Sequence, residues 1–197
     1  MLKLFYKLPN GKTFAHISRS ATSTLALHAL QQFYPERLAV YLEQSKVSNI
    51  SPQSFLEEHW ANRLPPECLC MVRKPEDRLQ SMLARNSHFT EIDVSAVLNM
   101  SAKEAIITRP ISKQLTILKV LHLAPITNIA ENDSTFVLWP DIKEACGLLG
   151  LEYDNTIKVN QLTEKAKIRF EGINLFTEWK TLLNDSTQLW ETLCLQN

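Results

Sequence analysis

The chain has 197 residues, 45% of them hydrophobic and 21% charged, which is the composition of a globular protein able to bury a core of its own. Lys plus Arg equals Asp plus Glu at 21 each, and this zero net charge argues against a general nucleic-acid-binding protein and against a polybasic membrane anchor. The sequence contains neither a run of about 18 apolar residues nor the apolar core of a signal peptide, so we expect a cytoplasmic protein that does not enter a membrane.

The first third of the chain predicts a hairpin followed by helices. Apolar runs at residues 2–8 and 13–17 flank Asn10-Gly11, and Asn-Gly between two such runs is a strong hairpin signal. The helices are expected from apolar residues at helical spacing and from serine or proline at a helix start. They cover residues 23–33, 36–44 and 51–62.

The rest of the chain alternates short apolar runs with helical patterns. Two compact runs have the length of buried strands, residues 68–72 and 136–139. Helices are expected from residue 75, over 95–105, over 111–123, from 141 to Gly147 or Gly150, and from 172 to the C-terminus. Buried strands that alternate with helices indicate a parallel sheet covered on both faces. We therefore predict one domain over residues 1–197, a three-layer α/β/α fold with a central, mostly parallel sheet.

The four cysteines indicate free thiols rather than disulfides or a metal site. Cys68 and Cys70 flank one residue of an apolar run, so on a strand they share a face and cannot easily bond each other. Neither the cysteine spacing nor nearby histidines suggest zinc, and we predict no metal. Buried, reduced thiols fit a reducing compartment.

The turn over residues 16–25, which follows the second apolar run, is the first candidate site. It reads His-Ile-Ser-Arg-Ser-Ala-Thr-Ser-Thr-Leu, a cluster of small hydroxyl residues with one cation ahead of a helix. A helix start offers free N–H groups and a positive dipole end, and Arg19 adds a charged donor fork, so the turn predicts oxyanion binding. The alternative is that Ser20 or Thr22 simply caps the helix. The glycine-rich loop of nucleotide kinases is absent.

The turn over residues 73–81 is the second candidate site. Ligands of α/β sheets bind beyond the carboxyl ends of strands, and Arg73 stands at such an end. The segment has the form Arg-x-Pro-x-x-Arg-x-x-Ser, and an arginine with a hydroxyl suits a terminal phosphate. Arg78 and Ser81, three residues apart, share a helix face. The alternative is an ordinary helix start, because Pro75 and Glu76 both favour one.

Together, the two turns resemble the sulfotransferase family. Residues 16–25 are similar to its 5′-phosphosulfate loop, commonly His-Ile-Pro-Lys-Thr-Gly-Gly-Thr-Ser-Leu, and more so to the Lys-Thr-Ala-Ser-Thr-Ser variant of the heparan and chondroitin 2-O-sulfotransferases. Arg19 stands where the family has its catalytic lysine, and Ser18 replaces a proline. The resemblance implies that the 5′ phosphate and sulfate are bound by Arg19, Ser20, Ala21, Thr22, Ser23 and Thr24.

Residues 73–81 resemble the 3′-phosphate-binding motif of the same family, typically Val-Arg-Asp-Pro-x-x-Arg-x-x-Ser-x-Tyr. The resemblance implies that Arg73 and Ser81 hold the 3′ phosphate, while Arg78 is structural, and Leu83 replaces the expected aromatic residue. Residues 136–151 resemble a later strand and helix of the family, and residues 158–167 a segment that closes over the nucleotide. The fold implied is the P-loop NTPase-like fold of sulfotransferases.

The resemblance implies transfer of a sulfuryl group from 3′-phosphoadenosine 5′-phosphosulfate (PAPS), as co-substrate, to an acceptor hydroxyl or amine, without a metal. Arg19 would stabilise the leaving phosphate, and a base should deprotonate the acceptor. His59 is the first candidate for that base, beside Glu57 and Glu58. His88 and His16 are further options.

Two alternatives remain open. A small-molecule kinase should carry a phosphate-loop lysine, which is missing, and a magnesium-holding acid, for which Asp141 is the one candidate. A catalytically impaired sulfotransferase-like protein would bind a phosphorylated nucleotide or act as an interaction module, and arginine in place of lysine at residue 19 favours it. The neutral charge favours a small or neutral acceptor over a polyanionic glycan. The chain is short for the family, so we expect acceptor-binding insertions to be reduced or to be supplied by a second subunit, as in a homodimer.

Overall fold

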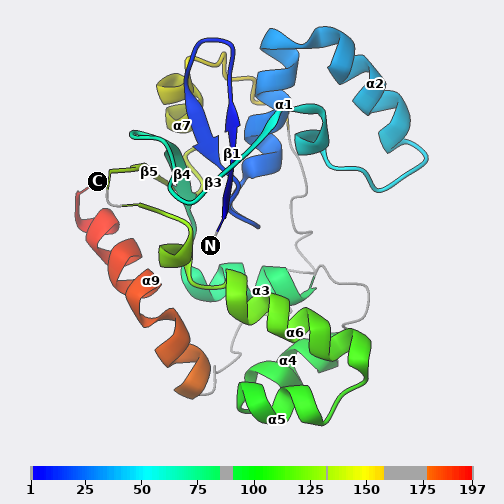
Figure 1. The fold of residues 1–197 in the computed structure, drawn as a ribbon, viewed down its shortest axis with the longest axis vertical. Helices are drawn as coiled ribbons and strands as arrows, with labels where there is room; N and C mark the ends of the chain where they lie inside the picture. Colours follow the sequence, from blue (N-terminus) through cyan, green and yellow to red (C-terminus); the bar gives the residue numbers. More distant parts are fainter. Residues whose placement is uncertain (1, 85–90, 132, 158–176, 197) are drawn as a thin grey trace. The chain divides into compact units, whose positions relative to one another are not determined.

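The computed structural model describes residues 2–84, 91–131, 133–157 and 177–196 (Figure 1). Contacts within the chain group it into two compact units. Unit 1 comprises Met1–Val72 and Ile129–Asn160, and unit 2 comprises Arg73–Asn128 and Gln161–Asn197. Each unit is described by itself, and the single domain expected over residues 1–197 stays a prediction.

Unit 1 is built on a five-stranded sheet in the order β3-β1-β2-β4-β5. The hairpin predicted around Asn10-Gly11 is confirmed: β1 and β2 pair antiparallel, and Gly11 takes a positive φ of 84° in the turn. The parallel pairs are β2 with β4 and β4 with β5. The strand bounds are Lys3–Lys7 for β1, Thr13–Ala15 for β2, Glu58–Ala61 for β3, Leu69–Val72 for β4 and Thr135–Leu138 for β5.

The fold of unit 1 is therefore α/β, as predicted, but its sheet is mixed rather than mostly parallel. Two of its neighbouring pairs are antiparallel, β1 with β2 and β1 with β3. A tight turn such as Asn10-Gly11 can only join antiparallel strands, while the long connections after β2 and β4 allow parallel pairing. The second helical layer and the P-loop NTPase-like topology stay predictions.

Strand β3 lies where a helix was predicted, so that prediction is wrong. Only a short 3₁₀ helix, η1 (Pro52–Phe55), follows the serine and proline start signal. The chain then extends along β1, with Glu58 opposite Tyr6 and Ala61 opposite Lys3. Pairing with the open edge of β1 gives the backbone groups on one side of this short segment hydrogen-bond partners, and here it outweighs the local helix-start signal.

One face of the sheet carries the core of unit 1, and α1 (Thr22–Phe33) and α7 (Ile142–Leu149) pack on it (Figure 1). Both helices were predicted, as was α2 (Pro35–Ser45), which packs beside α1 and has no fully buried residue. The α7 helix ends at Gly150, whose φ of 66° is the left-handed conformation that glycine favours. The buried core side chains include Tyr6, Phe14, Leu25, Ala29, Leu69, Met71, Val137, Ala145 and Leu149.

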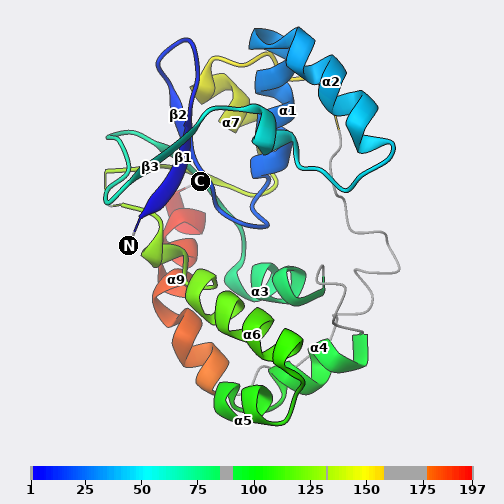
Figure 2. The ribbon, with the colours of Figure 1, turned by 45° about the vertical axis from the view of Figure 1, so that its right-hand side comes forward.

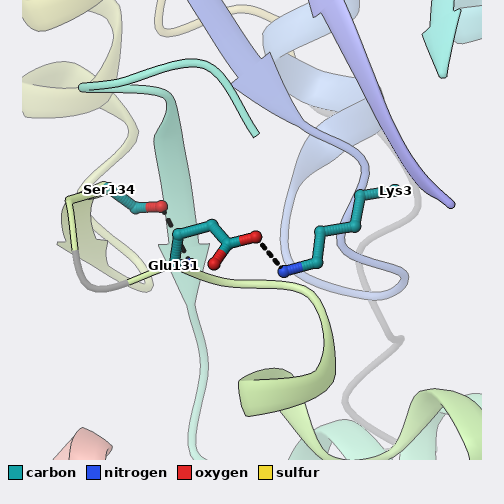
Figure 3. A network of polar contacts seen from close by, with 3 residues as sticks. All are labelled: Lys3, Glu131 and Ser134. Atoms are coloured by element: carbon teal, nitrogen blue, oxygen red, sulfur yellow. Dashed lines mark hydrogen bonds and ion pairs between the residues drawn. The ribbon is translucent and has the colours of Figure 1, made fainter. Parts of the chain in front are cut away.

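A polar network ties the start of β1 to the segment before β5 (Figure 3). The Lys3 ammonium forms an ion pair with the Glu131 carboxylate, and both side chains are largely buried. The hydrogen bond from the Lys3 ammonium lowers the pKa of the Glu131 carboxyl group. The Glu131 backbone N–H donates to Ser134 Oγ at 3.1 Å. These contacts link β1 to the segment that precedes β5.

Unit 2 is helical, and Figure 2 shows α3 and α6 side by side within it. The predictions from residue 75 and over 111–123 are confirmed. The helix predicted over 95–105 is instead two helices, because Ser101 starts a new one by accepting the Glu104 N–H at 3.1 Å. The helices are α3 (Pro75–Ala84), α4 (Glu91–Leu98), α5 (Ala102–Ile107), α6 (Ile111–Leu123), η2 (Ile126–Asn128) and α9 (Thr177–Gln196).

The core of unit 2 gathers around Trp179 of α9, which is fully buried. Its indole N–H lies 3.2 Å from Val97 O and 3.0 Å from Met100 O, at the end of α4. The carboxylate of Glu178 accepts the Ala102 N–H at 2.8 Å, so α9 also caps the start of α5. Contacts from one segment of α9 thus stabilise α4 and α5, two helices that are too short to be stable on their own.

The cysteines are free thiols, as predicted, but Cys194 is exposed rather than buried. Burial raises the pKa of Cys68 to about 11 and of Cys70 to about 12, so both stay protonated at neutral pH. Across the residues that the structure describes, no helix is long and apolar enough to cross a membrane.

Candidate anion-binding site

The turn that joins β2 to α1 carries the residues predicted to bind an anion. It leaves the sheet at His16, whose N–H donates to Leu4 O of β1 at 2.8 Å, and Ile17 is completely buried. The Ser20 N–H donates back to Ile17 O at 3.2 Å, and α1 begins at Thr22. The turn is therefore short, has an internal hydrogen bond, and is held between the end of β2 and the start of α1.

Residues with positive φ alternate with residues without it along the backbone of the turn. Arg19 and Ala21 have positive φ values of 65° and 61°, whereas Ser20 between them and Thr22 after them do not. Such alternation turns successive N–H groups toward one point, and the resulting concavity, called a nest, binds anions in phosphate loops. Positive φ costs about 1–2 kcal/mol at a residue with a Cβ. Ala21 stands where the sulfotransferase pattern has glycine, and its φ fits a glycine position.

Helix α1 begins without a side-chain cap, so the capping alternative for this turn is wrong. Its N-cap residue is Ala21, which has no side-chain acceptor. The Thr22 hydroxyl donates to Ile17 O at 3.0 Å and so closes the turn instead of capping the helix. The N–H groups of Thr22 and Ser23 belong to the first turn and have no intrahelical carbonyl to bond. An anion in the nest would satisfy donors that nothing in the helix satisfies.

The hydroxyl of Ser20 is the least satisfied polar group of the turn. Ser20 is completely buried, and within the part of the chain that the structure describes its Oγ has no hydrogen-bond partner. A buried hydroxyl without a partner costs about 1–3 kcal/mol. Ser20 lies between Arg19 and Ala21, the two residues with positive φ, so an anion bound in the nest would be a candidate acceptor for its hydroxyl.

Replacing Ser20 by alanine should therefore stabilise the protein and weaken anion binding. We expect the free energy of unfolding of the ligand-free protein to rise by about 1 kcal/mol, because an unsatisfied buried hydroxyl is removed. Affinity for adenosine 3′,5′-bisphosphate should fall about tenfold. Urea denaturation and calorimetric titration measure the two changes. A Ser20→Ala protein that is destabilised, or that binds as well as wild type, would contradict this role.

The other predicted residues of this turn differ in what their side chains do. Ser23 is half-buried, and its Oγ lies 2.8 Å from Gln53 Nε2 and 3.1 Å from Gln53 Oε1. Thr24 is buried, and its N–H already bonds Ala21 O at 2.9 Å. Arg19 is partly exposed. Sequence analysis missed Gln53, because a buried glutamine beside a helix-start proline has no distinguishing pattern.

His59, predicted as the base, lies on β3 rather than on a helix. Its ring stacks on Phe5 with centroids 5.4 Å apart, and its Nε2 lies 3.6 Å from Glu57 Oε1. Phe5 pairs with both His59 and Ala15, so the three share one face of the sheet. Ala15 precedes the nest, and two strand spacings put it about 10 Å from His59. The structure brings Arg19 to Thr24 together in one turn and places His59 outside it.

The second turn belongs to unit 2 and leads into α3. Arg73 is partly exposed, and its Nε is buried with no hydrogen-bond partner among the residues that the structure describes. Burial lowers the pKa of Arg73, while nearby Asp77 raises it. Arg78 and Ser81 are both buried, which confirms that they share a helix face. The Arg78 guanidinium donates to Ala124 O at 2.5 Å and to Leu123 O at 2.7 Å, so it holds the end of α6. Its predicted structural role is confirmed.

A hollow of about 760 Å³ lies against the middle of α1, away from the nest. The polar groups that line it bond one another: His28 nitrogens lie 2.8 Å from Thr24 O and 3.2 Å from Asp154 O. The Gln32 amide bonds Gly150 O at 2.9 Å and the Glu152 N–H at 2.7 Å. These contacts fasten the segment after α7 onto α1, which is a structural role.

Two predicted parts of the site lie outside the described residues. They are His88, a further option for the base, and residues 158–167, the segment expected to close over the nucleotide. Asp141, the magnesium candidate of the kinase alternative, caps α7 by accepting the Glu144 N–H at 2.9 Å. The described residues contain no cluster of three or more His, Cys, Asp or Glu side chains that could hold a metal.

Comparisons with protein-family models, with curated proteins and with solved structures found no match for this chain. The sulfotransferase resemblance therefore rests on the residues of the two turns.

Proposed function

We propose that the protein is a PAPS-dependent sulfotransferase that moves a sulfuryl group from the nucleotide to an acceptor hydroxyl or amine. The observation that carries the proposal is the nest at Arg19–Thr22, which contains Ser20, a residue whose buried hydroxyl has no hydrogen-bond partner among the described residues. The resemblance of both turns to the sulfotransferase motifs, each after a strand and before a helix, supports this donor among phosphate compounds.

In the proposed reaction the bond between sulfur and the bridging 5′-phosphate oxygen breaks as a bond from sulfur to the acceptor oxygen or nitrogen forms. Adenosine 3′,5′-bisphosphate leaves, and the acceptor proton passes to a base. The nest N–H groups and Arg19 bind the 5′ phosphate and neutralise the charge that develops on it. Arg73 and Ser81 hold the 3′ phosphate. His59 is the base to be tested first, because it shares a sheet face with Ala15.

A second candidate is a protein of this family that binds the nucleotide without transferring sulfate. Two observations favour it. Arginine at residue 19 keeps the charge of the family lysine but cannot titrate or pivot as an ammonium does. His59 is held by Phe5 and Glu57 rather than by any residue of the nest. In that case the acceptor-binding parts are irrelevant, and the protein acts as an interaction module.

The test is release of adenosine 3′,5′-bisphosphate from PAPS in the presence of phenol and sugar acceptors. We expect turnover by the wild type, and a KM for PAPS about 100-fold higher in Arg73→Ala, because a charge-assisted bond to the 3′ phosphate is lost. Lys74→Ala is the matched control: Lys74 is exposed and lies 3.6 Å from Glu76, and its loss should change KM less than twofold.

The two candidates and a failure give different results in this assay. Saturable nucleotide binding without turnover on any acceptor would replace the sulfotransferase by the binding protein. Turnover with equal KM values for Arg73→Ala and Lys74→Ala would refute the assignment of Arg73 to the 3′ phosphate.

A further inference from the structure

The side chain of Gln53 contacts Ser23, the residue that follows the nest. It belongs to η1, which packs against α1, and it is only 6% exposed. Its amide contacts two serine hydroxyls: Ser23, at the start of α1, and Ser51, which donates to Gln53 Oε1. A buried amide with contacts to a residue of the anion site can affect that site without touching the anion.

The polarity of these contacts decides what the Ser23 hydroxyl can do. Gln53 Nε2 has only hydrogens to offer, so at 2.8 Å it donates to Ser23 Oγ. The Ser23 proton then has Gln53 Oε1 as an acceptor at 3.1 Å in the same amide. The Ser23 oxygen is therefore held in place, while the hydroxyl hydrogen can rotate toward a different acceptor.

The hydrogen bond from Ser51 lowers the energetic cost of reorienting the Ser23 hydroxyl. Because Ser51 donates to Gln53 Oε1, this oxygen keeps a partner when the Ser23 proton leaves it. An anion in the nest is a better acceptor than a neutral amide, since hydrogen bonds to charged groups are about twice as strong. No buried group is left unsatisfied by the exchange.

We propose that Gln53 is a positioning residue for the anion site: it fixes Ser23 Oγ and accepts the Ser23 hydrogen bond until a bound anion accepts that hydrogen bond instead. The inference rests on the proposed function in that the anion is the 5′ phosphosulfate of the donor. It adds a residue from a different element to the site and assigns the Ser51–Gln53–Ser23 chain a role in binding.

The experiment is calorimetric titration of the full chain with adenosine 3′,5′-bisphosphate for the wild type and four variants: Gln53→Met, Gln53→Glu, Ser23→Ala and Ser23→Ala/Gln53→Met. We expect Gln53→Met to weaken binding about fivefold and Ser23→Ala about tenfold. The double variant should bind no more weakly than Ser23→Ala, because Gln53 acts through Ser23. Gln53→Glu should bind the nucleotide most weakly, since a carboxylate accepts a strong hydrogen bond from the Ser23 hydroxyl and repels the anion.

Thermal unfolding of each variant separates positioning from a purely structural role. Unchanged affinity in Gln53→Met at a temperature where it is folded overturns the proposal, whatever its melting temperature. Additive losses in the double variant also overturn it.

A parallel titration with inorganic phosphate separates this proposal from the proposed function. Phosphate binding without any preference for the nucleotide would refute the donor assignment, and the same variants would then test Gln53 with phosphate. Binding of neither ligand by the wild type overturns both.

Discussion

Replacing Arg78 by methionine is expected to lower the free energy of unfolding by about 3 kcal/mol. Arg78 is almost completely buried, and it donates to Leu123 O and Ala124 O at the end of α6. Methionine fills much of the same volume but leaves both carbonyl groups without this donor, and each such loss costs about 1–3 kcal/mol. Burial lowers the pKa of Arg78 to about 10, so the guanidinium is still charged at neutral pH. Urea denaturation at neutral pH measures the change.

Lys119→Met is the matched control for this prediction. Lys119 is exposed on α6 itself, and surface substitutions of this kind change stability by less than about 0.5 kcal/mol. Equal stabilities of the Arg78→Met and Lys119→Met proteins would contradict the role of Arg78 at the end of α6.

Replacing Arg19 by alanine should lower kcat for sulfuryl transfer about 100-fold to 1,000-fold. The guanidinium is proposed to neutralise charge on the leaving phosphate, and loss of one such group typically has an effect of this size. Nucleotide affinity should fall less, because the backbone nest remains. Arg19→Lys should keep most of the activity, since lysine is the family residue. Initial rates at saturating PAPS measure kcat directly.

Lys12→Ala serves as the control for Arg19→Ala, because Lys12 is an exposed cation in the hairpin of the same unit. Its kcat should equal that of the wild type. A drop in kcat shared by both variants would point to a general electrostatic effect, and an unchanged kcat in Arg19→Ala would exclude Arg19 from the chemistry.

Local signals predicted much of the fold. Proline at residue 110 and helical spacing placed α6 correctly, and Asn10-Gly11 placed the hairpin. The failure at β3 has a physical reason: its four residues form a strand because β1 offers them an open edge, and that edge is distant in sequence. The division of the region around Ser101 into two helices likewise depends on contacts from α9.

The candidate site was predictable in chemistry but not in geometry. Small hydroxyl residues and a cation before a helix indicated anion binding at residues 16–25. No glycine announced the positive φ values of Arg19 and Ala21, and capping by Ser20 or Thr22 was an equally reasonable outcome until the structure placed Ala21 at the cap. The lack of a partner for the Ser20 hydroxyl among the described residues, and the contact of Gln53 with Ser23, depend on packing that sequence periodicity does not encode.

The most direct test of a donor site that begins at the nest is calorimetric titration of the wild-type chain with adenosine 3′,5′-bisphosphate. Adenosine 5′-monophosphate, which lacks the 3′ phosphate, is the matched ligand. We predict saturable one-site binding of the bisphosphate in the micromolar range and at least about tenfold weaker binding of the monophosphate, because one charge-assisted contact is missing. Absence of binding, or equal affinity for the two nucleotides, would contradict the proposed donor site.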